Sequence, residues 1–206
     1  QNRLPTCTSV LIPGPGLNPE LAFHGEENHV AEGCVDHRGR VTETPAYEGT
    51  PDGDVVAVTA KFGTRNPEPE RDIAESIAGE VALGHASGPG MTFPERVATT
   101  VANAKARPTF AAFAANVADA LEAAGIDAPV YYLKGDAAML SAAAMCSTPA
   151  HAIRAGAAAS TLGLVALSGV EDAVCVDVGG TTTDVTRVTD GFPATEAVSA
   201  GDLETG

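Results

Sequence analysis

Short β-branched, apolar runs alternate with helical patterns along this chain of 206 residues, and this alternation restricts the fold more than any other feature. Runs of strand length occupy residues 55–60 (VVAVTA), 81–83 and 129–134 (PVYYLK), and helical patterns lie between them. Elements that alternate in this way form layers, with helices packed on a sheet. The sequence therefore predicts a layered α/β fold.

Three helices of moderate length are expected. The first begins at residues 66–68 (NPE), because Asn caps a helix, Pro suits its first position and Glu favours its positive end. Ile73 and Ile77 then lie on one face. A short helix near residues 141–147 ends before a proline, and a helix of small residues covers 155–168, where small side chains allow close approach to a neighbour.

The longest helical pattern spans residues 94–124. We expect a break near Pro108, because proline lacks an amide donor and clashes with the preceding turn. An apolar stripe recurs at three-then-four spacing and consists of Phe110, Phe113, Val117 and Leu121. Gly125 is a favourable C-cap.

Residues 1–54 are rich in Pro and Gly and show little periodicity. We expect an irregular segment there, with short strands such as Val10–Ile12. The predicted organisation is an irregular segment over 1–54, an α/β lobe over 55–150, and a helix with a β-hairpin over 151–206. The chain begins at Gln1 without Met, and we interpret it as a fragment of a longer protein.

Composition excludes several classes of protein. With 44% hydrophobic and 19% charged residues the chain is not a disordered tail, and no apolar run reaches the roughly 18 residues of a membrane span. A net charge of -15 opposes binding to a nucleic-acid backbone. The four cysteines have no C-x-x-C spacing, which argues against a zinc knuckle and favours a reduced, cytoplasmic protein.

The stretch that indicates chemistry is DVGGTTTDV, residues 177–185. It joins a strand expected to be buried, 174–178, to a second strand over 181–189. Gly179 and Gly180 carry no side chain, so an anion can approach their amides. Hydroxyl donors are supplied by Thr181, Thr182 and Thr183.

Two carboxylates flank this turn. Asp177 can hold a hydrated Mg²⁺ or orient a water, and Asp184 can do the same or cap the hairpin. The stretch is neither a Walker loop, since no Gly-Lys-Ser/Thr follows, nor a G-x-G-x-x-G motif. A plain β-hairpin is the alternative, but two aspartates, two glycines and three threonines in nine residues favour a phosphate clamp.

These nine residues resemble the second phosphate loop of the actin, sugar kinase and Hsp70 ATPase superfamily. They are most similar to the pattern D-[MIV]-G-G-T-[ST]-T-D-V of the hydantoinase A / 5-oxoprolinase family. Four more segments resemble that family in the same order, over roughly residues 55–200: 64–71 (TRNPEPER, with its N-P-x-x-E), 96–108 (RVATTVANAKARP), 132–140 (YLKGDAAML) and 149–164 (PAHAIRAGAAASTLGL).

The resemblance implies two actin-like ATPase (ribonuclease H-like) lobes, each with a mixed sheet flanked by helices. It makes 151–206 the connecting helix and phosphate-binding hairpin, while the family's first phosphate loop and its adenosine-binding segment have no counterpart in these residues. The implied activity is ATP-dependent opening of hydantoin, N-methylhydantoin or 5-oxoproline, with ATP and Mg²⁺ as cofactors, although some relatives carboxylate ketones. A hydantoinase B-type subunit usually completes the enzyme, and a homo-oligomer is also possible.

By the same resemblance, residues 179–183 bind phosphate, Asp177 serves the metal or the attacking group, and Asp184 is a second catalytic candidate. Two family motifs are altered: S-D-G-G becomes residues 135–138 (GDAA) and S-G-P-A becomes 155–158 (AGAA). Asp136 survives, either as a site residue or as a cap. The alternative functions are a small-molecule kinase or ligase that uses the same clamp, and a relative without catalysis.

Overall fold

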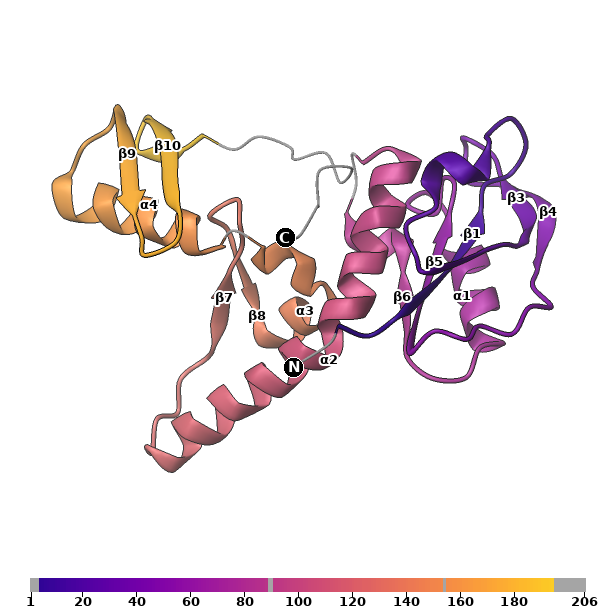
Figure 1. The fold of residues 1–206 in the computed structure, drawn as a ribbon, viewed down its shortest axis with the longest axis horizontal. Helices are drawn as coiled ribbons and strands as arrows, with labels where there is room; N and C mark the ends of the chain where they lie inside the picture. The colour runs from indigo at the N-terminus through magenta and orange to yellow at the C-terminus, as the bar shows by residue number, and fades with distance from the viewer. Residues whose placement is uncertain (1–3, 89–90, 154, 195–206) are drawn as a thin grey trace. The chain divides into compact units, whose positions relative to one another are not determined.

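The computed structural model describes residues 4–88, 91–153 and 155–194 of the chain (Figure 1). They form two compact units that meet in the chain between Thr109 and Phe110, and we call these the N-unit (4–109) and the C-unit (110–194). The N-unit contains β1 (Cys7–Ile12), η1 (Pro19–Ala22), β2 (Glu27–Val30), β3 (Glu32–Val35), β4 (Val41–Ala46), β5 (Val55–Ala60), α1 (Glu68–Glu75), β6 (Val81–Leu83), η2 (Gly84–Ser87) and the first half of α2 (Phe93–Ala123). The C-unit contains the rest of α2, β7 (Tyr131–Leu133), β8 (Met139–Ser141), α3 (Ala142–Ser147), η3 (Pro149–Ala152), α4 (Ala155–Ser168), β9 (Ala173–Val178), β10 (Thr183–Thr189) and β11 (Phe192–Pro193).

A four-stranded parallel sheet forms the centre of the N-unit, in the order β2-β1-β5-β6. β1 and β5 pair along their whole length, with Val10 opposite Val58. Every residue of both strands is buried. A parallel sheet that is covered on both faces requires near-continuous apolar strands, and the run VVAVTA meets this requirement.

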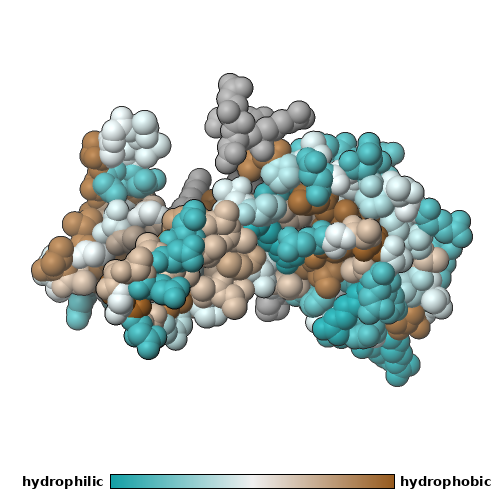
Figure 2. Space-filling model, turned by 90° about the horizontal axis from the view of Figure 1, so that it is seen from below, coloured by the Kyte–Doolittle hydropathy of each residue, from teal (hydrophilic) through white to brown (hydrophobic). Residues whose placement is uncertain are grey.

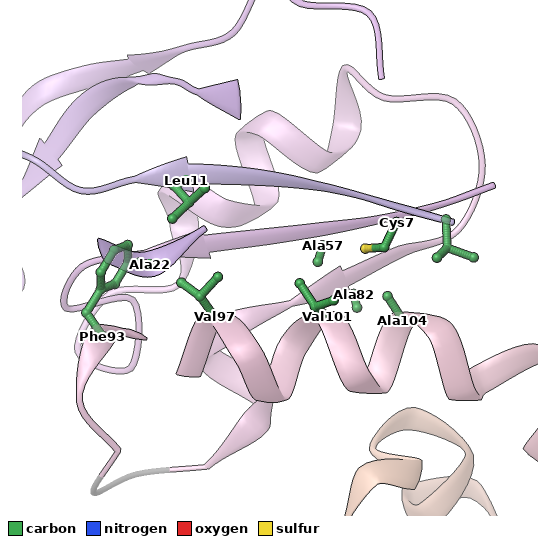
Figure 3. Close-up of a cluster of buried hydrophobic side chains, with 10 residues drawn as sticks. Cys7, Leu11, Ala22, Ala57, Ala82, Phe93, Val97, Val101 and Ala104 are labelled. Atoms are coloured by element: carbon green, nitrogen blue, oxygen red, sulfur yellow. The ribbon is translucent and has the colours of Figure 1, made fainter. Parts of the chain in front are cut away.

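Helices cover the two faces of this sheet. Cys7 and Leu11 point from β1 toward α2, where they meet Val97 and Val101 (Figure 3). Val10 and Ile12 of β1 point to the opposite face and pack in a second cluster that includes Ile73 of α1. The core of the N-unit therefore consists of two apolar layers, one on each side of the sheet.

The N-terminal segment, which is expected to be irregular, contributes β1 and β2 to this sheet. β1 begins at Cys7 and is therefore longer than the expected Val10–Ile12 strand. The additional residues include Thr8 and Ser9, which are polar and yet fully buried. The hydroxyl of Thr8 donates to Oε2 of Glu27 at 2.6 Å, which allows it to be buried. The division of the compact units after Thr109 also differs from the expected boundaries at 54/55 and 150/151.

Helix α2 continues through Pro108, so the expected break there is wrong. Its start is a capping box, in which the amide of Thr92 donates to Oε2 of Glu95 at 2.7 Å and the amide of Glu95 reaches the Thr92 hydroxyl at 3.5 Å. A proline removes one backbone hydrogen bond, and the alanine-rich turns that follow favour the helix strongly enough to continue it.

The C-unit contains two small antiparallel sheets, β7–β8 and β9–β10–β11. Helix α4 lies against β9, β10 and β11. Phe110, Phe113 and Tyr132 form an aromatic cluster with ring centroids 5.1–6.0 Å apart. This cluster covers the predicted apolar stripe only in part, because Phe113 remains 52% exposed.

Strand β9 forms where it is predicted, but the expectation that it is buried is wrong. Three of its residues are largely exposed: Val174 (66%), Val176 (54%) and Val178 (74%). Hydrophobic side chains are visible on the outside of this part of the chain, at the left of Figure 2. The strand has the composition of a buried strand, yet nothing among the described residues covers this face.

Other local predictions are confirmed. The strands at 55–60 and 81–83 and the helix at 155–168 have the expected bounds. Gly125 ends α2 with φ +67°, and the amide of the next residue donates to the Leu121 carbonyl at 2.9 Å. Asp190 and Gly191 both have positive φ and connect β10 to β11. No described helix is long and apolar enough to cross a membrane.

Candidate phosphate-binding site

The predicted motif is a strand, a turn and a strand, as expected from its sequence. β9 and β10 pair antiparallel, with Thr183 opposite Val178, and residues 179–182 make the turn. The amide of Gly179 donates to the carbonyl of Thr182 at 2.9 Å and closes the turn. The second strand begins at Thr183 instead of the predicted Thr181, because the turn uses two of the threonines.

The turn is exposed and rich in free donors. All of residues 179–183 are exposed to solvent. Among the described residues, no partner is found for the amides of Gly180, Thr181 and Thr182 or for the hydroxyls of Thr181, Thr182 and Thr183. Backbone amides and hydroxyls that converge on one turn are the groups that bind a phosphate. The turn therefore presents unpaired donors of the kind that a phosphate would need, and phosphate binding by residues 179–183 stays a prediction.

The folding of the chain does not explain the glycine at position 180. Gly180 lies outside the left-handed region, and a Cβ placed on it would meet no atom within 4 Å. Gly179 is only moderately restricted, since a Cβ there would lie 3.3 Å from the Thr182 carbonyl oxygen. A glycine that neither φ nor packing requires suits a position where a ligand approaches the backbone closely.

Asp177 and Asp184 face each other across the hairpin. They are directly paired in the β9–β10 register, so both side chains lie on the same face. Asp177 is half-buried, Asp184 is exposed, and neither makes an ion pair within the described residues. Two like charges in this position repel each other, and a bound cation would relieve the repulsion.

Two carboxylates suit Mg²⁺ better than a metal ion that takes all of its ligands from protein side chains. The described residues contain no group of three or more His, Cys, Asp or Glu side chains arranged to hold a metal ion. Mg²⁺ usually takes one or two carboxylates and completes its shell with water and substrate phosphates. The pair therefore matches a metal that arrives with a nucleotide.

A second loop, between β7 and β8, carries the altered S-D-G-G motif. Asp136 accepts a 2.6 Å ion pair from Lys134 and the amide of Ala138 at 3.0 Å, and the Lys134 hydrogen bond lowers the pKa of Asp136. These contacts satisfy Asp136 as a cap of its own turn. Ala137 occupies the left-handed region at φ +67°, which explains why the family pattern has glycine at this position.

A further polar cluster, in the N-unit, was not identified from the sequence. Glu70, the glutamate of the N-P-x-x-E motif, is fully buried and contacts His85. A signal was available in the sequence, because Gly84 and His85 directly follow the predicted strand 81–83, and the carboxyl ends of parallel strands are common ligand sites.

The chain has an actin-like α/β fold, which it shares with two solved structures of ATP-dependent enzymes. The acetone carboxylase structure, determined without nucleotide, superimposes with a TM-score of 0.62 at 15% identity. The ATP-dependent caprolactamase from Pseudomonas jessenii superimposes with a TM-score of 0.60 at 19% identity.

The family is shown by sequence. The hydantoinase/oxoprolinase family model matches residues 96–203, just over half of the chain, so this chain belongs to that family. No curated protein matches the chain significantly. The two solved structures cover 92% and 89% of this chain, whereas the chain spans about a third of their lengths, 33% and 32%.

Proposed function

We propose that this chain is part of an enzyme that uses ATP to open a cyclic amide, with hydantoin, N-methylhydantoin and 5-oxoproline as the candidate substrates. The observation that supports this best is the exposed turn at 179–182, whose amides and hydroxyls have no partners among the described residues. Membership of the hydantoinase/oxoprolinase family supports the substrate class. The caprolactamase is named for ATP-dependent action on another lactam.

In this proposal the turn binds the phosphates of ATP. The amides of Gly180–Thr182 and the three threonine hydroxyls donate to phosphate oxygens, while Asp177, with Asp184 opposite it, holds Mg²⁺. ATP supplies the phosphoryl group that converts the amide oxygen into a good leaving group. The contribution of the chain is to position this group and to neutralise its charge.

The reaction also needs components beyond these residues. We infer that a hydantoinase B-type subunit completes the enzyme, as the family resemblance implies. We place the reaction in the cytoplasm, because it consumes ATP and because all four cysteines are free.

The proposal is tested with the full-length protein and its hydantoinase B-type partner. Calorimetry with Mg-ATP compares the wild type with Gly180→Ala, which adds a methyl group where the phosphate would lie, and with Gly163→Ala in α4 as the matched control. We expect Gly180→Ala to raise Kd at least about tenfold, a loss of roughly 1.4 kcal/mol, and the control to bind normally.

Product analysis then distinguishes the possible activities. Ring-opened products from 5-oxoproline, hydantoin or N-methylhydantoin, formed only with ATP, support the proposal. Phosphorylation of a hydroxylated acceptor instead would identify a kinase. Nucleotide binding without hydrolysis would identify a relative that has lost catalysis.

A further inference from the structure

A buried carboxylate lies at the carboxyl ends of β5 and β6 in the N-unit. Glu70 of α1 is 0% exposed, and its two oxygens accept three hydrogen bonds. Oε1 accepts the amide of Ala60 at 2.8 Å, and Oε2 accepts the amide of His85 at 2.8 Å. Oε2 also contacts Nδ1 of the His85 ring at 2.6 Å. A buried carboxylate with this many donors is held in one position.

The surrounding sequence leaves room for this carboxylate. A Cβ on Gly63 would lie 2.2 Å from Oε1 of Glu70, and a Cβ on Gly84 would lie 3.0 Å from the same atom. Arg96 of α2 donates from Nη2 to the Ala60 carbonyl at 2.8 Å, next to the amide that Glu70 accepts. Two glycines and a buried arginine therefore surround a single acidic side chain.

The contact with Glu70 determines the tautomer of His85. Both oxygens of Glu70 accept backbone amides, so we assign the hydrogen on the 2.6 Å contact to Nδ1 of His85. This leaves Nε2 of a neutral ring as an acceptor. No described residue contacts Nε2, and the side chain of His85 is 21% exposed. His85 thus presents an oriented base to solvent.

The position of His85 in the fold is one where ligands bind. His85 follows β6 (Val81–Leu83) by two residues, at the carboxyl edge of the parallel sheet. In open α/β sheets, ligands bind outside the carboxyl ends of the strands. The ring contacts Glu70, and Glu70 in turn interacts electrostatically with Arg96.

We propose that His85 is a catalytic general base and acid in the opening of the cyclic amide, and that Glu70 is its positioning residue. This inference rests on the proposed function. A water oxygen bonds to the carbonyl carbon of the ring amide, and Nε2 of His85 takes a proton from that water. The ring C–N bond breaks and the same proton passes to the leaving nitrogen, which leaves an amine and, because the amide oxygen carries the phosphoryl group from ATP, an acyl phosphate. A second water then cleaves the acyl phosphate into the carboxylate and inorganic phosphate.

The test separates the role of His85 as a base from its structural hydrogen bond to Glu70. In His85→Asn the side-chain amide nitrogen replaces Nδ1 as a donor to Glu70, while the base at Nε2 is lost. His37→Asn, on an exposed turn between β3 and β4, is the matched control. We expect His85→Asn in the full-length enzyme with 5-oxoproline to lower kcat at least about 100-fold, with Mg-ATP binding and the unfolding temperature unchanged.

Two further readouts are independent of the Asn variant. His85→Gly should regain ring opening when imidazole is added, which a structural role would not produce. In ¹⁵N NMR of the wild type, Nδ1 of His85 should be protonated and Nε2 should not, and Glu70→Gln should give a mixture of tautomers. Addition of 5-oxoproline should shift the Nε2 resonance.

Specific results would overturn the inference. If His85→Asn opens the ring as fast as the wild type, His85 is not the base. The same holds if Nε2 does not respond to 5-oxoproline while ring opening proceeds. If the wild type binds Mg-ATP and opens no ring at all, the proposed function itself is wrong, and the role of His85 in it falls too. The wild-type assay alone distinguishes this last case from the others.

Discussion

The two units use their apolar residues in opposite ways. In the N-unit, a sheet buried on both faces uses almost every apolar strand residue for packing. In the C-unit, valines of β9 and Val185 of β10 remain exposed, as does Leu167 of α4 at 90%. Residues of the N-unit strands therefore support stability, whereas the hairpin residues of the C-unit make few contacts within the described chain. Substitutions in the N-unit strands should therefore affect stability, whereas substitutions in the hairpin of the C-unit should affect ligand binding.

The largest effect is expected for the carboxylate that we assign to the metal. Asp177→Ala in the full-length protein should lower ATP hydrolysis by about 100-fold or more, because the charge that holds Mg²⁺ is lost. Since Asp177 makes no ion pair among the described residues, the free energy of unfolding should change by less than about 0.5 kcal/mol. Asp172→Ala, on the exposed loop before β9, is the control. Unchanged turnover of Asp177→Ala would reject the assignment.

The same substitution in each unit tests the contrast in packing. Val10→Ala removes a fully buried side chain of β1 and should destabilise the protein by about 2 kcal/mol. Val176→Ala removes a side chain of β9 that is 54% exposed and should cost less than about 0.5 kcal/mol. Denaturant unfolding measures both values. Equal losses would show that the outer face of β9 is covered in solution, and the contrast between the units would be wrong.

A smaller, stabilising effect is expected at the altered motif. Ala137→Gly should stabilise the protein by about 1 kcal/mol, because an alanine in the left-handed region is strained and a glycine is not. Ala138→Gly is the control, since Ala138 lies outside that region and gains nothing from the change. Thermal unfolding measures the two shifts. A destabilised Ala137→Gly variant would contradict the backbone conformation at this position.

The smallest effect concerns acid stability of the N-unit. Hydrogen bonds, first of all from the Thr8 hydroxyl, lower the pKa of Glu27 to about 2 from an ordinary value of 4.5. A carboxylate with a depressed pKa contributes stability that is complete above its unfolded pKa and is lost as the pH falls through its folded pKa. Glu27→Gln should therefore be less stable than the wild type above pH 4.5, and the difference should disappear toward pH 2.

The control for this prediction is Glu48→Gln, which has no hydrogen-bond partner among the described residues. Unfolding free energies of the three proteins are compared from pH 7 to pH 2. A difference between Glu27→Gln and the wild type that is independent of pH would show that the loss comes from packing instead of from ionisation.

Much of the fold could be predicted from the sequence where one local pattern decides the structure. The run VVAVTA and the small-residue helix at 155–168 formed with the expected bounds, because composition and length leave few alternatives. Only the end of β1 is predicted, since its buried Thr8 and Ser9 are polar residues, and the Thr8 hydroxyl is satisfied by distant partners: it donates to Glu27, nineteen residues away, and accepts from the amide of Gly53. The short strand β8 was also missed, because it depends on pairing with β7.

In the candidate site, too, local features could be predicted from the sequence and long-range contacts could not. The turn at 179–182 could be predicted because glycines and threonines determine its chemistry locally. The pairing of Asp177 with Asp184 depends on the register of two strands, and the contact between Glu70 and His85 joins a helix to the end of a strand fifteen residues away. Such contacts depend on tertiary structure and leave only a weak signal in a single sequence.

The central claim is that the exposed turn of the β9–β10 hairpin binds the phosphates of ATP. Titration of the ¹⁵N-labelled full-length protein with Mg-ATP, followed through the backbone amide resonances of Gly180, Thr181 and Thr182, tests it most directly. The account predicts large, saturable shifts of these three amides at the concentration where nucleotide binds. Saturable binding of Mg-ATP that leaves all three resonances in place would contradict it.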